Sequence, residues 1–177
     1  MESSPVRHWY IAYTKSCQEK KSAEILGRLG FESYVPIQRE PHKWSDRIKI
    51  VDHILIRGLV FVRCTNAERK EVLDGVPYIY AFMMDRATRD KDGNTQPAVI
   101  QDREMERFKF MVSHAKGEVR ISSETFEPGD QVRIKEGPLA GMECEVVKVE
   151  GRTTAIVRLG VLGAATASVA AVNITKI

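Results

Sequence analysis

Histidine and cysteine are the residue types that most often supply catalysis or bind metal, and in this chain of 177 residues they are scattered. The histidines are His8, His42, His53 and His114, and the cysteines are Cys17, Cys64 and Cys144. Neither set contains a CxxC pair or a histidine couple at ligand spacing, so neither a zinc site nor a disulfide framework is expected. No nucleophile–base pairing and no phosphate-cradling glycine loop is present. We therefore expect no enzyme, no metal, no cofactor, and three buried or half-buried thiols.

The residues that could do other chemistry are cations on one face of a predicted helix. Lys20, Lys21, Glu24 and Arg28 share the face opposite the apolar positions of residues 22–29. Lysines so placed can contact phosphate groups. The alternative is that Lys20–Glu24 and Glu24–Arg28, as pairs four residues apart, only stabilise an exposed helix.

The net charge of +3 lies in the first part of the chain. Residues 1–114 hold 19 Lys and Arg against 16 Asp and Glu, whereas residues 115–177 hold eight of each. Any weak attraction to nucleic acid is therefore expected from residues 1–114. No apolar run approaches the ~20 residues that span a bilayer, and the start lacks the apolar stretch of a signal peptide. We expect a cytoplasmic protein that has no membrane partner.

The first part of the chain alternates strand and helix signals. The run WYIAY at 9–13 predicts a strand, and Ser16 with Glu19 forms a capping box for a helix that ends at Gly30. Residues 38–49 are polar and predict a loop or a hairpin tip. A second capping box is formed by Thr65 and Glu68. The remaining predicted elements are strands at 31–35, 50–56, 59–63 and 76–83, an exposed turn at 85–96, and a helix containing Met105, Phe108 and Val112.

From residue 115 the pattern changes. Residues 115–125 show no defensible period and are interpreted as a linker. From Phe126 onward, short alternating runs at 142–149, 155–159 and 167–174 are separated by turns. About five short strands in ~50 residues are typical of a small barrel, which closes to remove its exposed edges. The fold class is therefore α+β: an α/β unit followed by a small β-barrel.

Residues 129–149, GDQVRIKEGPLAGMECEVVKV, resemble the KOW motif. The motif positions are Val132, Ile134, Gly137, Pro138 and Gly141. The two glycines suit turn positions where a Cβ would clash, and the proline fixes its own φ. The apolar residues predicted to line the barrel core are Val132, Ile134, Val146 and Val149. Cys144 stands where the motif usually has glycine.

The order of the two parts resembles the NusG family of transcription elongation factors. The resemblance runs through WYIAY, VPYIYAFM (76–83), PAVIQDREM (97–105) and FEPGDQV (126–132). It implies an N-terminal polymerase-binding domain at 1–114, a linker at 115–125 and a KOW domain at 126–177. It also implies an antiparallel sheet flanked by helices in the first domain and an SH3-like barrel in the second.

The resemblance further implies an apolar patch that binds the clamp of RNA polymerase. Carried over to this chain, the patch comprises Trp9, Tyr10, Ile56 and Leu59. The family usually has an aromatic residue and then Tyr around these last two positions, so the patch stays apolar but loses aromatic surface. The alternative is that residues such as Trp9 and Ile56 are simply core residues.

The specialised family member RfaH reads the non-template DNA strand, and Lys15, Gln18 and Lys21 match its polar and basic positions. With Lys20 they are the candidate DNA-binding residues. Lysines would contact phosphate, and only Gln18 would reach a base edge.

In the KOW domain, Leu162 matches the residue that NusG offers to a small-subunit ribosomal protein or to Rho. Ala164 stands where arginine is usual. This departure, with those at 56–59 and 38–52, favours a monomeric, operon-dedicated antiterminator of the RfaH/UpxY type, which serves long operons such as those for capsule polysaccharide. The alternatives are a general NusG factor, which couples transcription to termination or translation, and a ribosome-associated RNA-binding protein.

Overall fold

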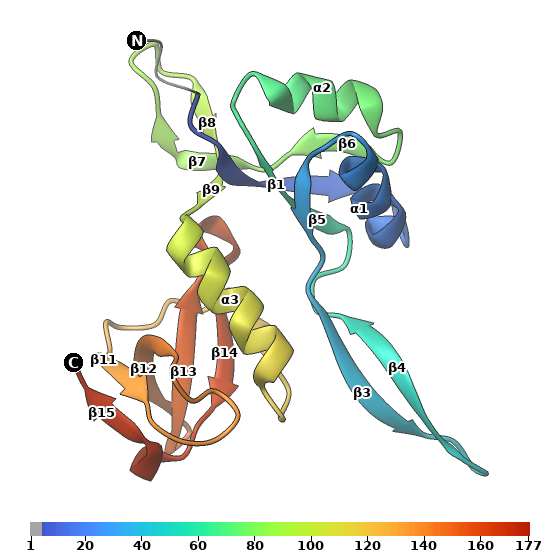
Figure 1. The fold of residues 1–177 in the computed structure, drawn as a ribbon. Helices are drawn as coiled ribbons and strands as arrows, with labels where there is room; N and C mark the ends of the chain where they lie inside the picture. The colour runs from blue at the N-terminus through green and yellow to red at the C-terminus, as the bar shows by residue number, and fades with distance from the viewer. Residues whose placement is uncertain (1–4) are drawn as a thin grey trace. The chain divides into compact units, whose positions relative to one another are not determined.

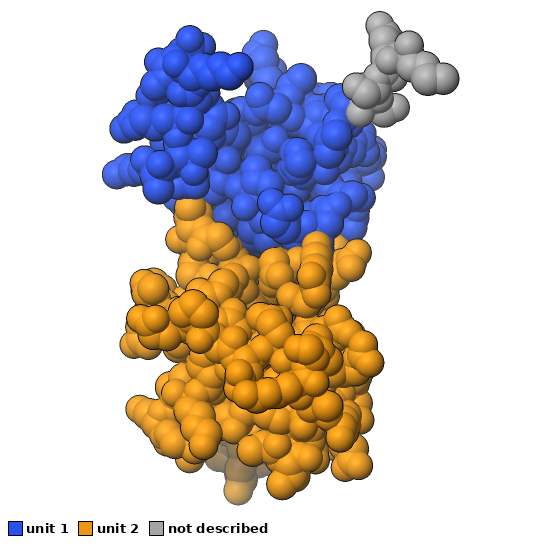
Figure 2. All heavy atoms as spheres, turned by 90° about the vertical axis from the view of Figure 1, so that its left-hand side faces the viewer, with its two compact units in different colours: residues 1–35, 56–102 blue, residues 36–55, 103–177 orange. Residues whose placement is uncertain are grey.

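The computed structural model describes residues 5–177, which divide into two compact units. Unit 1 comprises the described residues up to Val35 together with Ile56–Asp102, and unit 2 comprises Pro36–Leu55 together with Arg103–Ile177 (Figure 2). Helices and strands are mixed along the chain, as the sequence predicts. Within the described residues, no helix has the length and apolar character needed to cross a membrane.

A five-stranded antiparallel sheet forms the centre of unit 1 (Figure 1). Its strands are β1 (His8–Thr14), β2 (Glu32–Tyr34), β5 (Leu59–Cys64), β6 (Ile79–Phe82) and β9 (Val99–Ile100). They run in the order β2-β5-β1-β6, and β9 also pairs with β1. Strand β1 therefore has β5 on one side and both β6 and β9 on the other.

Two helices cover one face of this sheet, namely α1 (Glu19–Arg28) and α2 (Glu68–Gly75). Tyr10 of β1 stands opposite Val62 of β5, so both side chains lie on the same face. They belong to one buried cluster with Leu26 of α1 and Val72 of α2. Burying side chains of this size contributes roughly 1.5–3 kcal/mol each.

The opposite face of β1 and β5 is buried as well. Ile11 and Phe61, which are paired across the two strands, are both 0% exposed. Burial on both faces requires apolar residues at successive positions, which explains the unbroken run WYIAY.

The two predicted capping boxes have different outcomes. The box at the start of α2 is confirmed: the backbone N–H of Thr65 donates to the Glu68 carboxylate (2.8 Å), and the Glu68 N–H donates to the Thr65 hydroxyl (3.1 Å). The predicted box of Ser16 and Glu19 is wrong, because α1 has no side-chain cap. The Glu19 carboxylate instead accepts a hydrogen bond from the backbone N–H of Gly58 (2.7 Å).

Unit 1 also contains a ribbon of two strands, β7 (Met84–Arg89) and β8 (Thr95–Pro97). The carboxylate of Asp90 accepts hydrogen bonds from the backbone N–H groups of Asn94 (2.8 Å) and Asp92 (2.9 Å). The hydrogen bond from Asn94 is the main cause that lowers the pKa of Asp90. The exposed turn predicted at 85–96 is therefore confirmed only for residues 90–94, because the flanking residues form β7 and β8.

Unit 2 contains a hairpin, a helix and a second sheet. The hairpin consists of β3 (Ile37–Lys43) and β4 (Ile48–Ile54), and the helix α3 runs through Asp102–His114. The sheet has the strand order β10-β14-β13-β12-β11-β15. Its strands are β10 (Arg120–Ser122), β11 (Asp130–Ile134), β12 (Glu143–Val149), β13 (Arg152–Arg158), β14 (Ala164–Ser168) and β15 (Ile174–Lys176).

Two segments of unit 2 have a secondary structure that differs from the one predicted from the sequence. Strand β10 pairs with β14 although it lies within residues 115–125. The single strand predicted at 167–174 is wrong. Strand β14 ends at Ser168, the short helix η2 (Ala171–Asn173) follows, and β15 begins at Ile174. The alanines of this run favour strands weakly, and the Asn173 N–H closes a turn by donating to Ala170 (3.0 Å).

The predicted core positions of the KOW sequence are mostly buried. Val132, Ile134 and Val146 are between 0% and 7% exposed. The prediction for Val149 is only partly right, because this residue is half-buried. Cys144 lies inside β12 and is fully buried, so it occupies a strand position and not a turn.

Gly137 and Gly141 are needed for their backbone conformation, since their φ angles are +91° and +87°. A Cβ on Gly141 would meet nothing within 4 Å, and one on Gly137 would meet only the Asn173 side chain at 3.8 Å. The predicted clash is therefore wrong at both positions. A close approach exists instead at Gly129, where a Cβ would lie 2.2 Å from the carbonyl oxygen of Val146.

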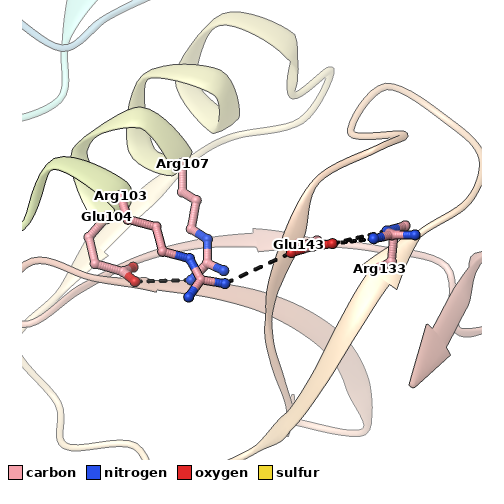
Figure 3. A network of polar contacts seen from close by, with 5 residues as sticks. All are labelled: Arg103, Glu104, Arg107, Arg133 and Glu143. Atoms are coloured by element: carbon pink, nitrogen blue, oxygen red, sulfur yellow. Dashed lines mark hydrogen bonds and ion pairs between the residues drawn. The ribbon is translucent and has the colours of Figure 1, made fainter. Parts of the chain in front are cut away.

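Ion pairs connect α3 to the sheet of unit 2 (Figure 3). Arg103 lies 3.8 Å from the carboxylate of Glu143 in β12, and Glu143 also pairs with Arg133 of β11. Within the helix, Arg107 pairs with Glu104 at 3.0 Å. The hydrogen bond from Arg133 is the main cause that lowers the pKa of Glu143. The carboxylate of Glu143 thus pairs with an arginine of the neighbouring strand β11 and with an arginine of α3.

The carboxylate of Glu145 joins three segments of unit 2. It accepts hydrogen bonds from the Gly129 backbone N–H (2.6 Å) and from Nη2 and Nε of Arg158 (2.8 and 2.9 Å). Arg158 also donates to the carbonyl of Phe126 (3.2 Å). The Arg158 hydrogen bond, aided by the Gly129 N–H, lowers the pKa of Glu145 below its ordinary value of 4.5.

We expect Glu145→Gln to destabilise unit 2 at neutral pH by about 1 kcal/mol, since Arg158 is exposed and solvent screens the pair. The pKa of Glu145 is lower in the folded chain than in the unfolded chain. Its contribution is therefore complete above about 4.5 and is lost as the pH falls through the folded-state pKa. Urea unfolding at several pH values should show the wild type and the variant converging in acid. Exposed Glu127→Gln is the control, and a difference for Glu145→Gln that stays constant with pH contradicts the prediction.

Candidate nucleic-acid interface

The four candidate DNA-binding residues lie at the end of β1 and the start of α1. Lys15, Lys20 and Lys21 are exposed, and Gln18 is half-buried at the N-terminal end of the helix. The side-chain oxygen of Gln18 has no hydrogen-bond partner among residues 5–177. Arg28, at the other end of α1, pairs with Glu24, as an exposed helix pair does.

Three tyrosines accompany these lysines. The rings of Tyr13 and Tyr80 are stacked, with centroids 5.9 Å apart and planes at 18°. The ammonium of Lys21 lies 5.9 Å from the ring of Tyr78, and the backbone N–H of Lys15 donates to the Tyr78 carbonyl (2.8 Å). These five residues are called the tyrosine–lysine surface below.

The tyrosine–lysine surface has the chemistry of a nucleic-acid interface. Tyr80 is 61% exposed, so its ring can meet a ligand. Within the described chain, neither Lys15 nor Lys21 has a carboxylate within ion-pair distance. Aromatic faces that accept bases and cations that accept phosphates are the usual parts of a single-strand site.

Sequence reasoning found the lysines of this surface but missed the tyrosines. The available signal was the alternation in VPYIYAF, where Ile79 is buried and its neighbours Tyr78 and Tyr80 lie on the other face. The contribution of Tyr13 depends on the pairing of β1 with β6, where it stands opposite Ala81. Such pairing between residues 68 positions apart is not encoded in local spacing.

A buried carboxylate fixes the turn between β4 and β5 to the start of α1. Glu19 is 3% exposed and accepts the hydrogen bond from Gly58, whose carbonyl in turn accepts from the Thr14 N–H (2.8 Å). Gly58 has a φ of +74°, which favours glycine. The residues that follow and precede this turn, Leu59 and Ile56, are thereby positioned near the end of β1.

The four residues predicted to bind polymerase differ in exposure. Trp9 and Tyr10 are each 3% exposed, and Leu59 is 6% exposed. The ring of Tyr10 packs edge-on against Phe82 at 6.1 Å. Ile56 is half-buried and offers the most accessible apolar surface of the four.

Leu162 lies in the short helix η1 (Gly160–Leu162) of unit 2 and is half-buried. Its neighbour Val161 is 45% exposed. Gly163 follows with a φ of +90°, and a Cβ there would lie 2.1 Å from the Ser122 carbonyl oxygen. The loop is therefore held tightly while its apolar tip stays accessible.

Unit 1 thus combines helices and an antiparallel sheet with a basic, tyrosine-lined surface, and unit 2 contains a second antiparallel sheet with a Gly-Pro turn. The family model described as transcription termination factor nusG matches residues 7–109. The model of the KOW motif matches residues 128–159. The first match covers more than half of the chain, and the chain therefore belongs to the NusG family of transcription factors.

Solved structures that match this chain include one described as domain interaction in Thermotoga maritima NusG. It is 22% identical, with 97% of each chain covered and a TM-score of 0.43. The MjSpt4:Spt5 complex is 16% identical in conformations A and B, with TM-scores of 0.30 and 0.33. These matches cover 96% of this chain and 97% and 96% of the others. A search of curated proteins found no match.

We expect Glu19→Ala to leave the Gly58 N–H without its acceptor and to lower the free energy of unfolding by about 1–3 kcal/mol. Glu19→Gln, which keeps a carbonyl oxygen, should cost less. Urea unfolding with the Gly58 amide resonance as a probe measures both. Glu24→Ala, on the exposed face of the same helix, is the matched control and should change stability by about 0.5 kcal/mol or less. Equal effects of Glu19→Ala and Glu24→Ala contradict the role of the buried hydrogen bond.

Proposed function

We propose that this chain is a non-enzymatic transcription elongation factor that binds the clamp of RNA polymerase and keeps transcription processive. The observation that carries the proposal is the match of residues 7–109 to the NusG family, with a KOW motif following at 128–159. The proposed domains are a polymerase-binding domain at 1–114, a linker at 115–125 and an SH3-like KOW barrel at 126–177.

The proposed polymerase contact is the apolar patch of Trp9, Tyr10, Ile56 and Leu59. The hydrogen bond from Gly58 to Glu19 supports it, because this bond holds the turn that carries the last two residues. The low exposure of Trp9, Tyr10 and Leu59 assigns them a supporting role beneath the patch. Ile56 is then the residue that contacts polymerase directly.

The proposed DNA contact is with the non-template strand of the transcription bubble, through Lys15, Gln18, Lys20 and Lys21. The tyrosines of the tyrosine–lysine surface support it, since stacked and exposed rings accept unpaired bases. The side-chain oxygen of Gln18 is buried and lacks a hydrogen-bond partner in the described chain, so reading a base edge requires this side chain to turn outward.

The KOW domain is proposed to bind a further partner through Leu162, either a small-subunit ribosomal protein or Rho. The neighbouring exposed Val161 extends the apolar surface of this loop. Ala164 begins strand β14 in the place where the family usually has arginine, so this loop offers no cation to a partner. A ribosomal RNA partner is disfavoured, because residues 115–177 carry no net charge.

Ile56→Asp should weaken retention of RNA polymerase from a bacterial lysate by at least ~10-fold, because it places a charge in an apolar contact. Immobilised full-length protein and an immunoblot for polymerase measure the loss. The control is Val172→Asp, which makes the same kind of change at a position 88% exposed in unit 2. Polymerase retention that is equal for both variants argues against the patch.

The operon-specific form of the function has a separate test. We propose antitermination at one or a few long operons, such as those for surface polysaccharide. Deletion of the gene should then lower the promoter-distal transcripts of those operons and leave other transcripts unchanged in RNA sequencing. A general elongation defect would instead support a general NusG role.

A further inference from the structure

The hairpin formed by β3 and β4 has a fixed base and a free tip. At the base, the buried side chain of Gln38 donates to the Gly117 carbonyl (2.7 Å) and accepts from the Val119 N–H (3.1 Å), all within unit 2. The two strands pair only with each other (Figure 1). Every residue from Pro41 to Ile50 is exposed.

The register of the hairpin separates two faces at the tip. His42 stands opposite Lys49, and the Trp44 N–H donates to the Arg47 carbonyl (2.8 Å), which extends the same ladder. Because side chains alternate along a strand, these four residues lie on one face. The rings of His42 and Trp44 meet edge-on at 5.4 Å, as expected for neighbours on that face. They are called the hairpin face below.

The opposite face at the tip combines aliphatic side chains with one cation, Lys43. Pro41 stands opposite Ile50, and Lys43 stands opposite Ile48. The two isoleucines are 68% and 71% exposed. One side of the tip therefore carries the aromatic rings with two cations, and the other carries the two isoleucines beside Lys43, so the two sides can be altered independently.

Charges are paired near the base and unpaired at the tip. Near the base, Arg39 lies 3.6 Å from the carboxylate of Asp52. At the tip, Lys43, Arg47 and Lys49 have no carboxylate within ion-pair distance in the described part of the chain. With Asp46 as the one acidic residue, residues 41–50 carry a net charge of +2. A ligand with negative charge complements this tip.

We propose that the hairpin face binds an unpaired nucleic-acid strand, with a base stacked on Trp44 and phosphates contacted by Arg47 and Lys49. Trp44 is 54% exposed, so a large part of this residue is accessible to a base. Aromatic side chains flanked by cations are the standard means of holding a single strand without regard to sequence. Arg47 directly precedes β4 and Lys49 lies within it, so in extended backbone they are about 7 Å apart, which suits adjacent phosphates of an extended chain.

An unpaired strand fits the hairpin face better than a duplex. The faces of bases in a duplex are occupied by their stacked neighbours, so a duplex would engage the cations but not the indole. This surface uses none of the residues of the tyrosine–lysine surface. The inference goes beyond the proposed function and does not depend on polymerase binding.

The test is fluorescence anisotropy of labelled 12-mers, oligo(dT), oligo(U) and a duplex, titrated with the full chain at two salt concentrations. Trp44→Ala should weaken single-strand binding by about 5- to 150-fold, and Trp44→Phe should retain most of it. Lys49→Gln should lower the slope of log affinity against log salt by about 0.7. Because Trp9 is 3% exposed, quenching of exposed tryptophan emission reports on Trp44.

The matched control is Ile50→Ala, which alters the opposite face of the same hairpin and should leave the affinity unchanged. A double variant with Lys15→Gln and Lys21→Gln separates the contribution of the tyrosine–lysine surface. The comparison of oligo(dT) with oligo(U) distinguishes DNA from RNA as the natural strand.

The proposal is overturned if Trp44→Ala binds single strands as the wild type does. It is also overturned if the duplex binds as tightly as the single strands. Loss of polymerase retention by Ile50→Ala, together with unchanged oligonucleotide binding by Trp44→Ala, would assign the hairpin to a protein partner. Thermal unfolding of each variant checks that the fold is intact.

Discussion

Strand β1 is the constraint on which unit 1 depends. It pairs with three other strands and is buried on both faces, so its position is fixed by hydrogen bonds and by packing together. The residues at the C-terminal end of β1 are held in place as a result. Tyr13 stacks on Tyr80, and Lys15 is held to Tyr78 by a backbone hydrogen bond. The proposed nucleic-acid contacts of unit 1 are thus placed by β1, whose buried residues fix its position and whose end carries Tyr13.

Unit 2 uses charged side chains for the same purpose. Glu145 joins a turn, β12 and β13 through one carboxylate, and Glu143 joins β11 and α3 through another. The buried amide of Gln38 anchors the hairpin base. In each case one polar group satisfies several partners, which is how an element that buries little apolar surface is held in place.

The sequence predicted those features that depend on residues close together in the chain. The run WYIAY and the box of Thr65 and Glu68 were readable because alternation and capping involve near neighbours. The hydrogen bond that Glu19 accepts could not be predicted from the sequence, since its donor is the backbone N–H of Gly58, 39 residues away. The same holds for Tyr80. Residues 38–49 were predicted as a loop or a hairpin tip, whereas most of them belong to β3 and β4, and the two faces of this hairpin follow only from the strand register.

The three thiols have a consequence for studying the molecule. Burial raises the pKa of Cys64 to about 12 and that of Cys144 to about 11, so both remain protonated and inaccessible at neutral pH. Cys17 is exposed beside Lys15 and Gln18. A maleimide reagent would therefore modify the natural chain at one position. A photoactivatable crosslinker could be placed there without mutagenesis, at the margin of the tyrosine–lysine surface.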